Sequence, residues 1–279
     1  MTAGQPAIPL DRIGAVVFDT DGVVIDSARV HAAAWKRSFD EFLRRHNRGA
    51  LTQERPFDVR ADYLRHLHGR SHADGVRAFL ASRGITLPDG AAVGQPFDGG
   101  VHLEHADGGE THEGDTVRGI AARTTHYFLQ EIDRYGVAAF RSAVALVREL
   151  RSRGARIAAV SHSPHSARIL AAANVQKLFD LRVDGLDPPG RSESALLLET
   201  TRQLDLPPRQ VAVVGQSLAG VAAARRAEFG LVVAVARDPD PPRRDWEATL
   251  RARGAQIVVR DLSEVGVLGR RREPEVLDR

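Results

Sequence analysis

The chain has 279 residues, 43% of them hydrophobic, which is enough for one large domain or two modest domains with a proper core. Its 39 Lys and Arg residues nearly balance its 36 Asp and Glu residues, and a formal net charge of +3 does not indicate a nucleic-acid partner. The lack of cysteine excludes disulfides, thiolate metal sites and a cysteine nucleophile. With neither an apolar run of membrane-spanning length nor a signal-peptide pattern, we expect a cytoplasmic protein without a membrane partner.

The first predicted element is a buried strand over residues 15–19, after a polar lead-in, residues 1–10, that we expect to be flexible. Asp19 ends this strand and Asp21 follows two residues later, so both side chains turn to the same side of an extended backbone. One acid can then be a nucleophile and the other a proton donor and acceptor. The alternative is structural, because D-x-D-G also occurs in calcium loops and in ordinary turns.

Residues 27–136 carry helical apolar spacing and no strand pattern. Ser27 can cap the first helix, and further helical stretches lie at 52–90, with breaks, and at 116–135. Between them, residues 89–116 are rich in Gly, acids and His, but the spacing matches no standard metal-ligand pattern. We therefore interpret 89–116 as a surface loop.

From residue 137 onward, helical patterns alternate with short apolar strands. The strands are expected at 155–160, 179–185, 211–214, 231–236 and 256–259. Such alternation predicts an α/β fold with a doubly wound parallel sheet. We therefore expect a core domain made of 11–26 and 137–268, a helical domain inserted at 27–136, and a flexible tail at 269–279.

The stretch F-D-T-D-G-V-V-I-D-S-A-R-V-H-A-A-A-W, residues 18–35, resembles the first motif of the haloacid dehalogenase superfamily, in its β-phosphoglucomutase-like branch. The resemblance implies a Rossmann-like core with an inserted α-helical cap. It also implies Asp19 as the phosphoryl-accepting nucleophile and Asp21 as the general acid and base. His31 fills the place of the motif's His, which makes it a candidate substrate contact, although a His on a helical apolar stripe is otherwise simply part of a core.

The resemblance extends to the residue that follows the second core strand. Ser161 stands where the superfamily's second motif has Ser or Thr, whose hydroxyl and adjacent backbone N–H groups, here that of His162, hold the phosphoryl oxygens. The alternative is a Ser that caps the next helix, and both roles are compatible.

The third and fourth motifs depart from the family pattern. Arg191 replaces the Lys of G-K-P-x-P-D, and Gly215 and Gln216 replace the two acids of E-D-S-x-x-G. The resemblance implies Mg²⁺ held by Asp19, by a backbone carbonyl beside Asp21 and by a fourth-motif acid. Gln216 offers only a neutral amide oxygen, so we expect Mg²⁺ binding to be weak or lost.

A cap-domain loop of the relatives also has a counterpart here. Residues 69–76 resemble the loop in which an Arg of the relatives grips the distal phosphate of the substrate. His72 stands in the place of that Arg, and Arg70 lies two residues before it. The alternative is a solvated loop.

Three functional hypotheses follow, and the last, a purely structural module of another enzyme, has no feature in its favour beyond the charged tail. The first is a phosphatase or sugar phosphomutase that acts on a small phosphorylated metabolite, such as a sugar phosphate, through an aspartyl-phosphate and with weakened Mg²⁺-dependent activity. The second is a catalytically inactive relative that binds a phosphorylated ligand or a protein partner. Retention of Asp19 and Asp21 favours the first hypothesis, and the changes in the third and fourth motifs favour the second.

Overall fold

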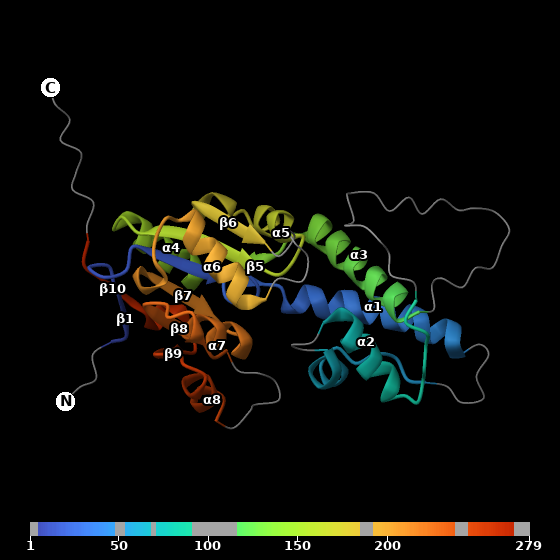
Figure 1. Cartoon of the computed structure of the whole chain (residues 1–279). Helices are drawn as coiled ribbons and strands as arrows, with labels where there is room; N and C mark the ends of the chain where they lie inside the picture. Colours follow the sequence, from blue (N-terminus) through green and yellow to red (C-terminus); the bar gives the residue numbers. More distant parts are fainter. Residues whose placement is uncertain are drawn as a thin grey trace. The chain divides into compact units, whose positions relative to one another are not determined.

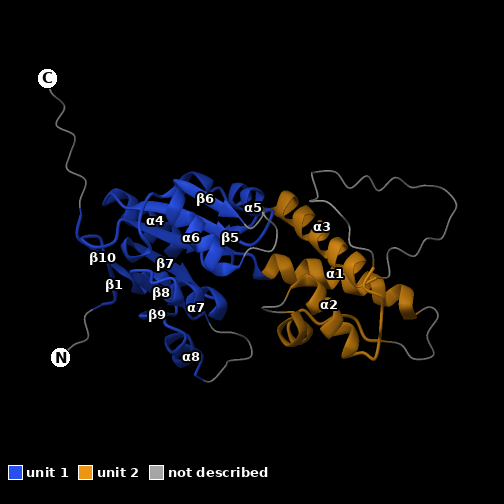
Figure 2. Cartoon of the chain, viewed as in Figure 1, with its two compact units in different colours: residues 1–28, 136–279 blue, residues 29–135 orange. Residues whose placement is uncertain are grey.

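The computed structural model describes residues 5–47, 54–67, 71–90, 116–184, 192–237 and 245–270. The chain divides into two compact units (Figure 2). Unit 1 consists of Met1–Ala28 and Gly136–Arg279, and unit 2 of Arg29–Tyr135. Unit 2 lies inside the segment 27–136 that the sequence predicts as an insertion.

Unit 1 is built on a six-stranded parallel sheet with the order β6-β5-β2-β7-β8-β9 (Figure 1). Its strands are β2 (Ala15–Asp19), β5 (Arg156–Ser161), β6 (Leu181–Asp184), β7 (Val211–Gly215), β8 (Leu231–Val235) and β9 (Ile257–Val259). Their runs of Val, Ile and Ala suit strands that are covered on both faces. The predicted doubly wound α/β fold is therefore confirmed.

Helices alternate with these strands along the chain. They are α4 (Arg141–Ser152), α5 (Ser166–Ala172), α6 (Glu193–Gln203), α7 (Leu218–Arg226) and α8 (Trp246–Ala252). Ala15 and Val17 of β2 belong to a buried cluster with Leu196 of α6 and Val221 of α7. Because side chains alternate along a strand, the fully buried Phe18 faces the opposite side of the sheet. Strand β2 is thus packed from both sides. This packing holds Asp19, the last residue of the strand, in a fixed position.

Two short strand pairs complete unit 1. Strand β3 (Ile25–Asp26) pairs antiparallel with β4 (Ala138–Ala139), close to the points where the chain leaves and re-enters this unit. Strand β1 (Ala7–Pro9) pairs in parallel with β10 (Gly266–Leu268).

The expectation that residues 1–10 are flexible is wrong for residues 5–10. Strand β1 lies against β10, and the side chains of Ile8 and Leu10 are fully buried. Burial of two large aliphatic side chains supplies the stabilisation that so short a strand lacks by itself. Residues 1–4 and 271–279 lie outside the described residues.

In the described part of unit 2, every regular element is helical. The elements are α1 (Ala28–Asn47, which begins at the unit boundary), a π-helical turn (Tyr63–Leu67), α2 (His72–Ala81) and α3 (Val117–Tyr135). The core of this unit is aromatic, with Trp35 stacked on Phe39 and Phe39 packed on Phe57 and Phe79. None of the described helices is both long enough and apolar enough to span a membrane.

Candidate functional site

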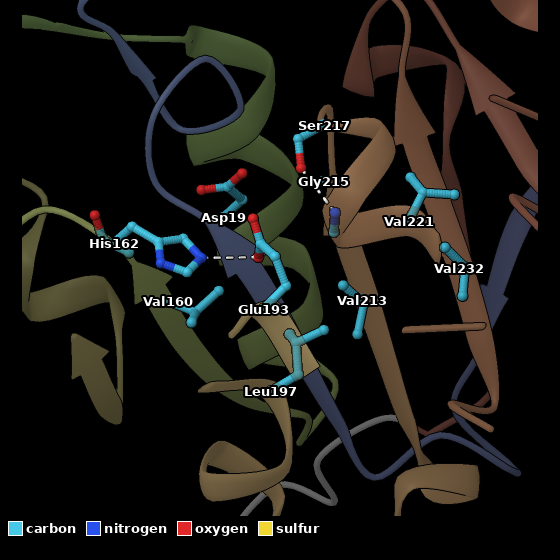
Figure 3. Close-up of a pocket in the computed structure, with 12 residues that line it drawn as sticks. Asp19, Val160, His162, Glu193, Leu197, Val213, Gly215, Ser217, Val221 and Val232 are labelled. Carbon is cyan, nitrogen blue, oxygen red and sulfur yellow. Dashed lines mark hydrogen bonds and ion pairs between the residues drawn. The ribbon is translucent and has the colours of Figure 1, made fainter. Parts of the chain in front are cut away.

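A pocket of unit 1 lies where the central strands of the sheet end (Figure 3). Asp19 from β2, Ser161 from β5 and Gly215 from β7 line it. Because Asp19 is in register with Val160, Ser161 is offset from it by one residue on the neighbouring strand. Parallel strands bring their carboxyl ends to one edge of the sheet, which is where such folds bind ligands.

The carboxyl group of Asp19 has a strongly perturbed acidity. Burial raises its pKa well above the ordinary value, and the nearby carboxylates of Asp21 and Glu193 raise it further. His162 and the backbone N–H of Thr20 act in the opposite direction and favour the ionised form. A carboxylate in such surroundings is the kind of group that marks a reactive centre rather than a solvated surface.

His162 and Glu193 form an ion pair inside the pocket. Nε2 of His162 lies 3.0 Å from Oε2 of Glu193, as the dashed line in Figure 3 shows. Hydrogen bonding to Glu193 raises the pKa of His162, and the negative charges of Glu193 and Asp19 contribute in the same direction. The pair therefore favours the protonated, cationic form of His162 beside Asp19.

Ser161 lies at the end of β5 and is buried. Its Oγ accepts a hydrogen bond of 3.1 Å from the backbone N–H of Ser163, so it orders the turn that follows the strand. The hydroxyl proton of Ser161 can be donated to a bound anion while this bond is kept, because a hydroxyl donates and accepts at the same time.

The turn after β2 holds the second acid. Gly22 adopts a φ of 73°, and the Oγ of Ser27 donates a 2.9 Å hydrogen bond to Oδ1 of Asp21. Burial raises the pKa of Asp21, and the hydrogen bond from Ser27 partly opposes this shift. A carboxyl group with a raised pKa carries its proton at a higher pH, which suits a proton donor.

Two side chains from neighbouring strand ends fix the backbone of this turn. Nε2 of Gln216, which follows β7, donates to the carbonyl of Asp21 at 3.1 Å. Nη1 of Arg237, which follows β8, donates to the carbonyl of Gly22 at 2.6 Å. The guanidinium of Arg237 also lies 3.2 Å above the centre of the Phe140 ring. Two consecutive carbonyls thus each receive a side-chain N–H group.

Comparison with known proteins identifies the family. A model of haloacid dehalogenase-like hydrolases matches residues 13–228. The chain belongs to the haloacid dehalogenase-like hydrolases. A β-phosphoglucomutase of Mycobacterium tuberculosis is 32% identical over 262 residues, which cover 91% of this chain and 92% of that protein.

Two further similarities are narrower. A trehalose-phosphate phosphatase of Mycobacterium leprae is 37% identical over 139 residues, 49% of this chain and 31% of that protein. Among solved structures, a haloacid dehalogenase family hydrolase from Deinococcus radiodurans with bound phosphate and sodium matches with a TM-score of 0.61 and 22% identity. That match covers 91% of this chain and 93% of the other, and it supports the fold.

At the Mg²⁺ site that the family resemblance implies, Gly215 and Gln216 offer no carboxylate. The carbonyl of Asp21 accepts a hydrogen bond from the amide of Gln216. Because a carbonyl oxygen is only an acceptor, the amide must present its NH₂ group to it. The amide of Gln216 thus places its nitrogen, and not its oxygen, against this carbonyl. Within the described residues, no group of three or more His, Asp or Glu side chains is arranged to hold a metal ion.

Two predicted substrate residues of unit 2, His31 and His72, lie among aromatic rings of that unit. The ring of His31 stacks on Phe128 at 4.0 Å, and His72 makes an edge contact with Trp35 at 5.2 Å. Burial lowers the pKa of His31 from 6.5 to about 4, so this imidazole is neutral at physiological pH. Nδ1 of His72 lies 3.2 Å from the hydroxyl of Thr125.

Of the residues predicted from the sequence, Asp19, Ser161 and His162 line one pocket, and Gln216 contacts the turn at Asp21. Arg70 and Arg191 lie outside the described residues. Sequence reasoning missed Glu193 and Arg237. Glu193 falls on the variable position of the third motif, where no pattern marks it. Arg237 directly follows a predicted strand end, and that position is a signal that could have identified it.

The contact between Gly22 and Gln216 leads to a prediction about stability. A β-carbon added at Gly22 would lie 1.8 Å from Nε2 of Gln216, in addition to the strain of a positive φ. Gly22→Ala should therefore lower the free energy of unfolding by more than the roughly 1 to 2 kcal/mol that a left-handed residue costs. In a Gln216→Ala background the same change should cost only that amount. Chemical unfolding of the four proteins measures this difference, and equal costs in both backgrounds would show that the amide does not occupy the turn.

Proposed function

We propose that this protein transfers phosphoryl groups, as a phosphatase or a sugar phosphomutase acting on a small phosphorylated metabolite. The observation that carries the proposal is the perturbed carboxyl group of Asp19 at the carboxyl end of the central strand, in a pocket with Ser161 and His162. A nucleophile beside hydroxyl and N–H donors is what phosphoryl transfer requires, because this reaction depends on positioning and charge stabilisation.

The proposed reaction has two steps. In the first, a carboxylate oxygen of Asp19 attacks phosphorus, the bond from phosphorus to the leaving oxygen breaks, and Asp21 gives its proton to that oxygen. In the second, water attacks the aspartyl-phosphate, Asp21 takes up the proton of the water, and Asp19 and inorganic phosphate are released. If a sugar hydroxyl replaces water, the same steps make a phosphomutase. Ser161 and the backbone N–H of His162 would hold the phosphoryl oxygens in both steps.

The comparisons support a sugar phosphate as the substrate. The Mycobacterium tuberculosis relative is a β-phosphoglucomutase, and the shorter match is a trehalose-phosphate phosphatase. The Deinococcus radiodurans hydrolase, whose structure has the same fold, contains bound phosphate and sodium. The family resemblance gives unit 2 the role of the cap domain and gives His31, Arg70 and His72 the role of substrate contacts, and Arg191 the role of a phosphate contact. These assignments are part of the proposal.

The proposal includes weak or absent dependence on Mg²⁺. Asp19 is the one carboxylate of the implied ligand set that the pocket retains, and the N–H of Gln216 takes the carbonyl of Asp21. Removal of a charged ligand weakens the binding of a hard cation that prefers carboxylate oxygens.

The same observation favours a second candidate function, that of a catalytically inactive protein that binds a phosphorylated ligand or a protein partner. In that case the pocket would bind a phosphate ester without forming an aspartyl-phosphate. Asp19 would then affect ligand affinity and would not be phosphorylated.

Replacement of Asp19 separates the two functions. With p-nitrophenyl phosphate, β-glucose 1-phosphate and trehalose 6-phosphate as probes, we expect slow turnover of at least one. Asp19→Asn should lower that rate by at least about a thousandfold, because it removes the nucleophile. Asp11→Asn, a change of an exposed carboxylate in the same unit, is the matched control and should keep the rate. Turnover that survives Asp19→Asn would contradict the proposed reaction, and no turnover of any probe would favour the second candidate.

Restoring the fourth-motif acids should restore metal dependence. A β-carbon at Gly215 would meet no atom within 4 Å, so Gly215→Glu has room for its first atom, and Gln216→Asp removes the N–H from the Asp21 carbonyl. The double variant should bind Mg²⁺ at least about tenfold more tightly than the wild type in calorimetry. Phosphatase activity should increase with it. Unchanged Mg²⁺ affinity would show that these two positions do not decide metal binding.

A further inference from the structure

The carboxylate of Glu193 lies among the groups that would hold a phosphoryl group. Its Oε2 is 3.0 Å from Nε2 of His162, and both side chains line the pocket with Asp19 (Figure 3). The same oxygen lies over the first turn of α7, since a β-carbon added at Gly220 would be 3.7 Å from it. Glu193 is therefore a carboxylate held inside an anion pocket by the pocket's own residues.

The contact with Glu193 occupies the imidazole N–H of His162, a second donor of the same residue whose backbone N–H is assigned to the phosphoryl oxygens. Nε2 of His162 carries a single proton, and a ring N–H directed at one acceptor is not available to a second. Glu193 also adds a second negative charge beside Asp19, and this charge raises the pKa of Asp19. An incoming phosphate would meet both the occupied donor and this repulsion.

The position of Glu193 on its helix suggests a simpler role, which is to stabilise the helix. The experiment must distinguish this role from an effect on phosphate binding. Glu193 is the first residue of α6, after the cap Ser192, and an acid in the first turn stabilises a helix by itself. That role requires no partner in the pocket. The side chain nevertheless reaches His162, which lies in the turn after β5, and 33% of it is exposed to solvent.

We propose that Glu193 is an internal competitor for the phosphate site. Its carboxylate occupies His162 in the absence of ligand, and a phosphate dianion or the phosphate of a monoester displaces it. Glu193 thereby sets the affinity of the pocket for phosphate. The inference rests on the proposed function in one respect, the identity of this pocket as the phosphoryl site.

The affinity for inorganic phosphate, measured by isothermal titration calorimetry on the full chain, tests the inference. Glu193→Gln should tighten binding by about tenfold, because it removes a like charge and replaces the competing carboxylate with a weaker, neutral acceptor. His162→Gln should weaken binding by about tenfold, because it removes the donor. In the His162→Gln background, Glu193→Gln should have a smaller effect, because the donor for which Glu193 competes is gone.

Two further variants separate competition from helix stabilisation. Glu193→Asp keeps the negative charge in the first turn of α6 but is one methylene shorter, so it should also tighten phosphate binding and should fold like the wild type. Glu199→Gln, on the same helix and paired with Arg202 instead, is the matched control and should leave the affinity unchanged. Phosphate binding that stays the same or weakens in both Glu193→Gln and Glu193→Asp would overturn the inference.

The outcomes distinguish this inference from the proposed function. If the Glu193 and His162 variants change phosphate affinity as predicted but no phosphate ester is turned over, the proposed reaction is overturned and the competitor role stands. If turnover depends on Asp19 but the Glu193 variants bind phosphate as tightly as the wild type, only the competitor role is overturned. If neither the wild type nor any variant binds phosphate, both are overturned.

Discussion

The structure of the site depends on one buried carboxyl group, that of Asp19. It stands at the end of the central strand of a sheet packed on both faces, with Asp21 and Glu193 as negative neighbours. An ionised carboxylate in such a place is costly unless nearby donors or cations compensate it. The side chain of His162 and the backbone N–H of Thr20 provide part of that compensation.

The turn that carries Asp21 and Gly22 shows how the departures in the fourth motif fit the rest of the structure. Carbonyl groups that are partly withdrawn from water need a partner, and here Gln216 and Arg237 provide N–H donors to two consecutive, partly buried carbonyls. The change from an acid to Gln216 therefore removes a carboxylate and adds a donor to the same turn. Arg237 further ties the turn to Phe140, whose backbone N–H donates to the carbonyl of Val24 at 2.8 Å. The protein's own side chains order this loop.

The sequence predicts the parts of the structure that carry a strong local signal. The apolar runs that end in Asp19, Ser161 and Gly215 mark strand ends, and parallel pairing brings such ends to one edge. The strand β1 escaped prediction because it is only three residues long, contains Pro9 and pairs with a segment at the other end of the chain. The role of Glu193 could not be predicted, because its contact with His162 arises from the packing of α6 against the sheet. No local pattern encodes that contact.

The central claim is that Asp19 becomes phosphorylated, and chemical trapping of the intermediate tests it most directly. An aspartyl-phosphate is an acyl phosphate, which borohydride reduces to homoserine, so a phosphorylated position is recorded as a change of residue in peptide mass spectra. The protein would be mixed with β-glucose 1-phosphate or acetyl phosphate, treated with borohydride and digested. The account predicts homoserine at position 19, and none there when the phosphate donor is omitted. Aspartate that remains unmodified at position 19 in a protein that turns over the same donor would contradict it.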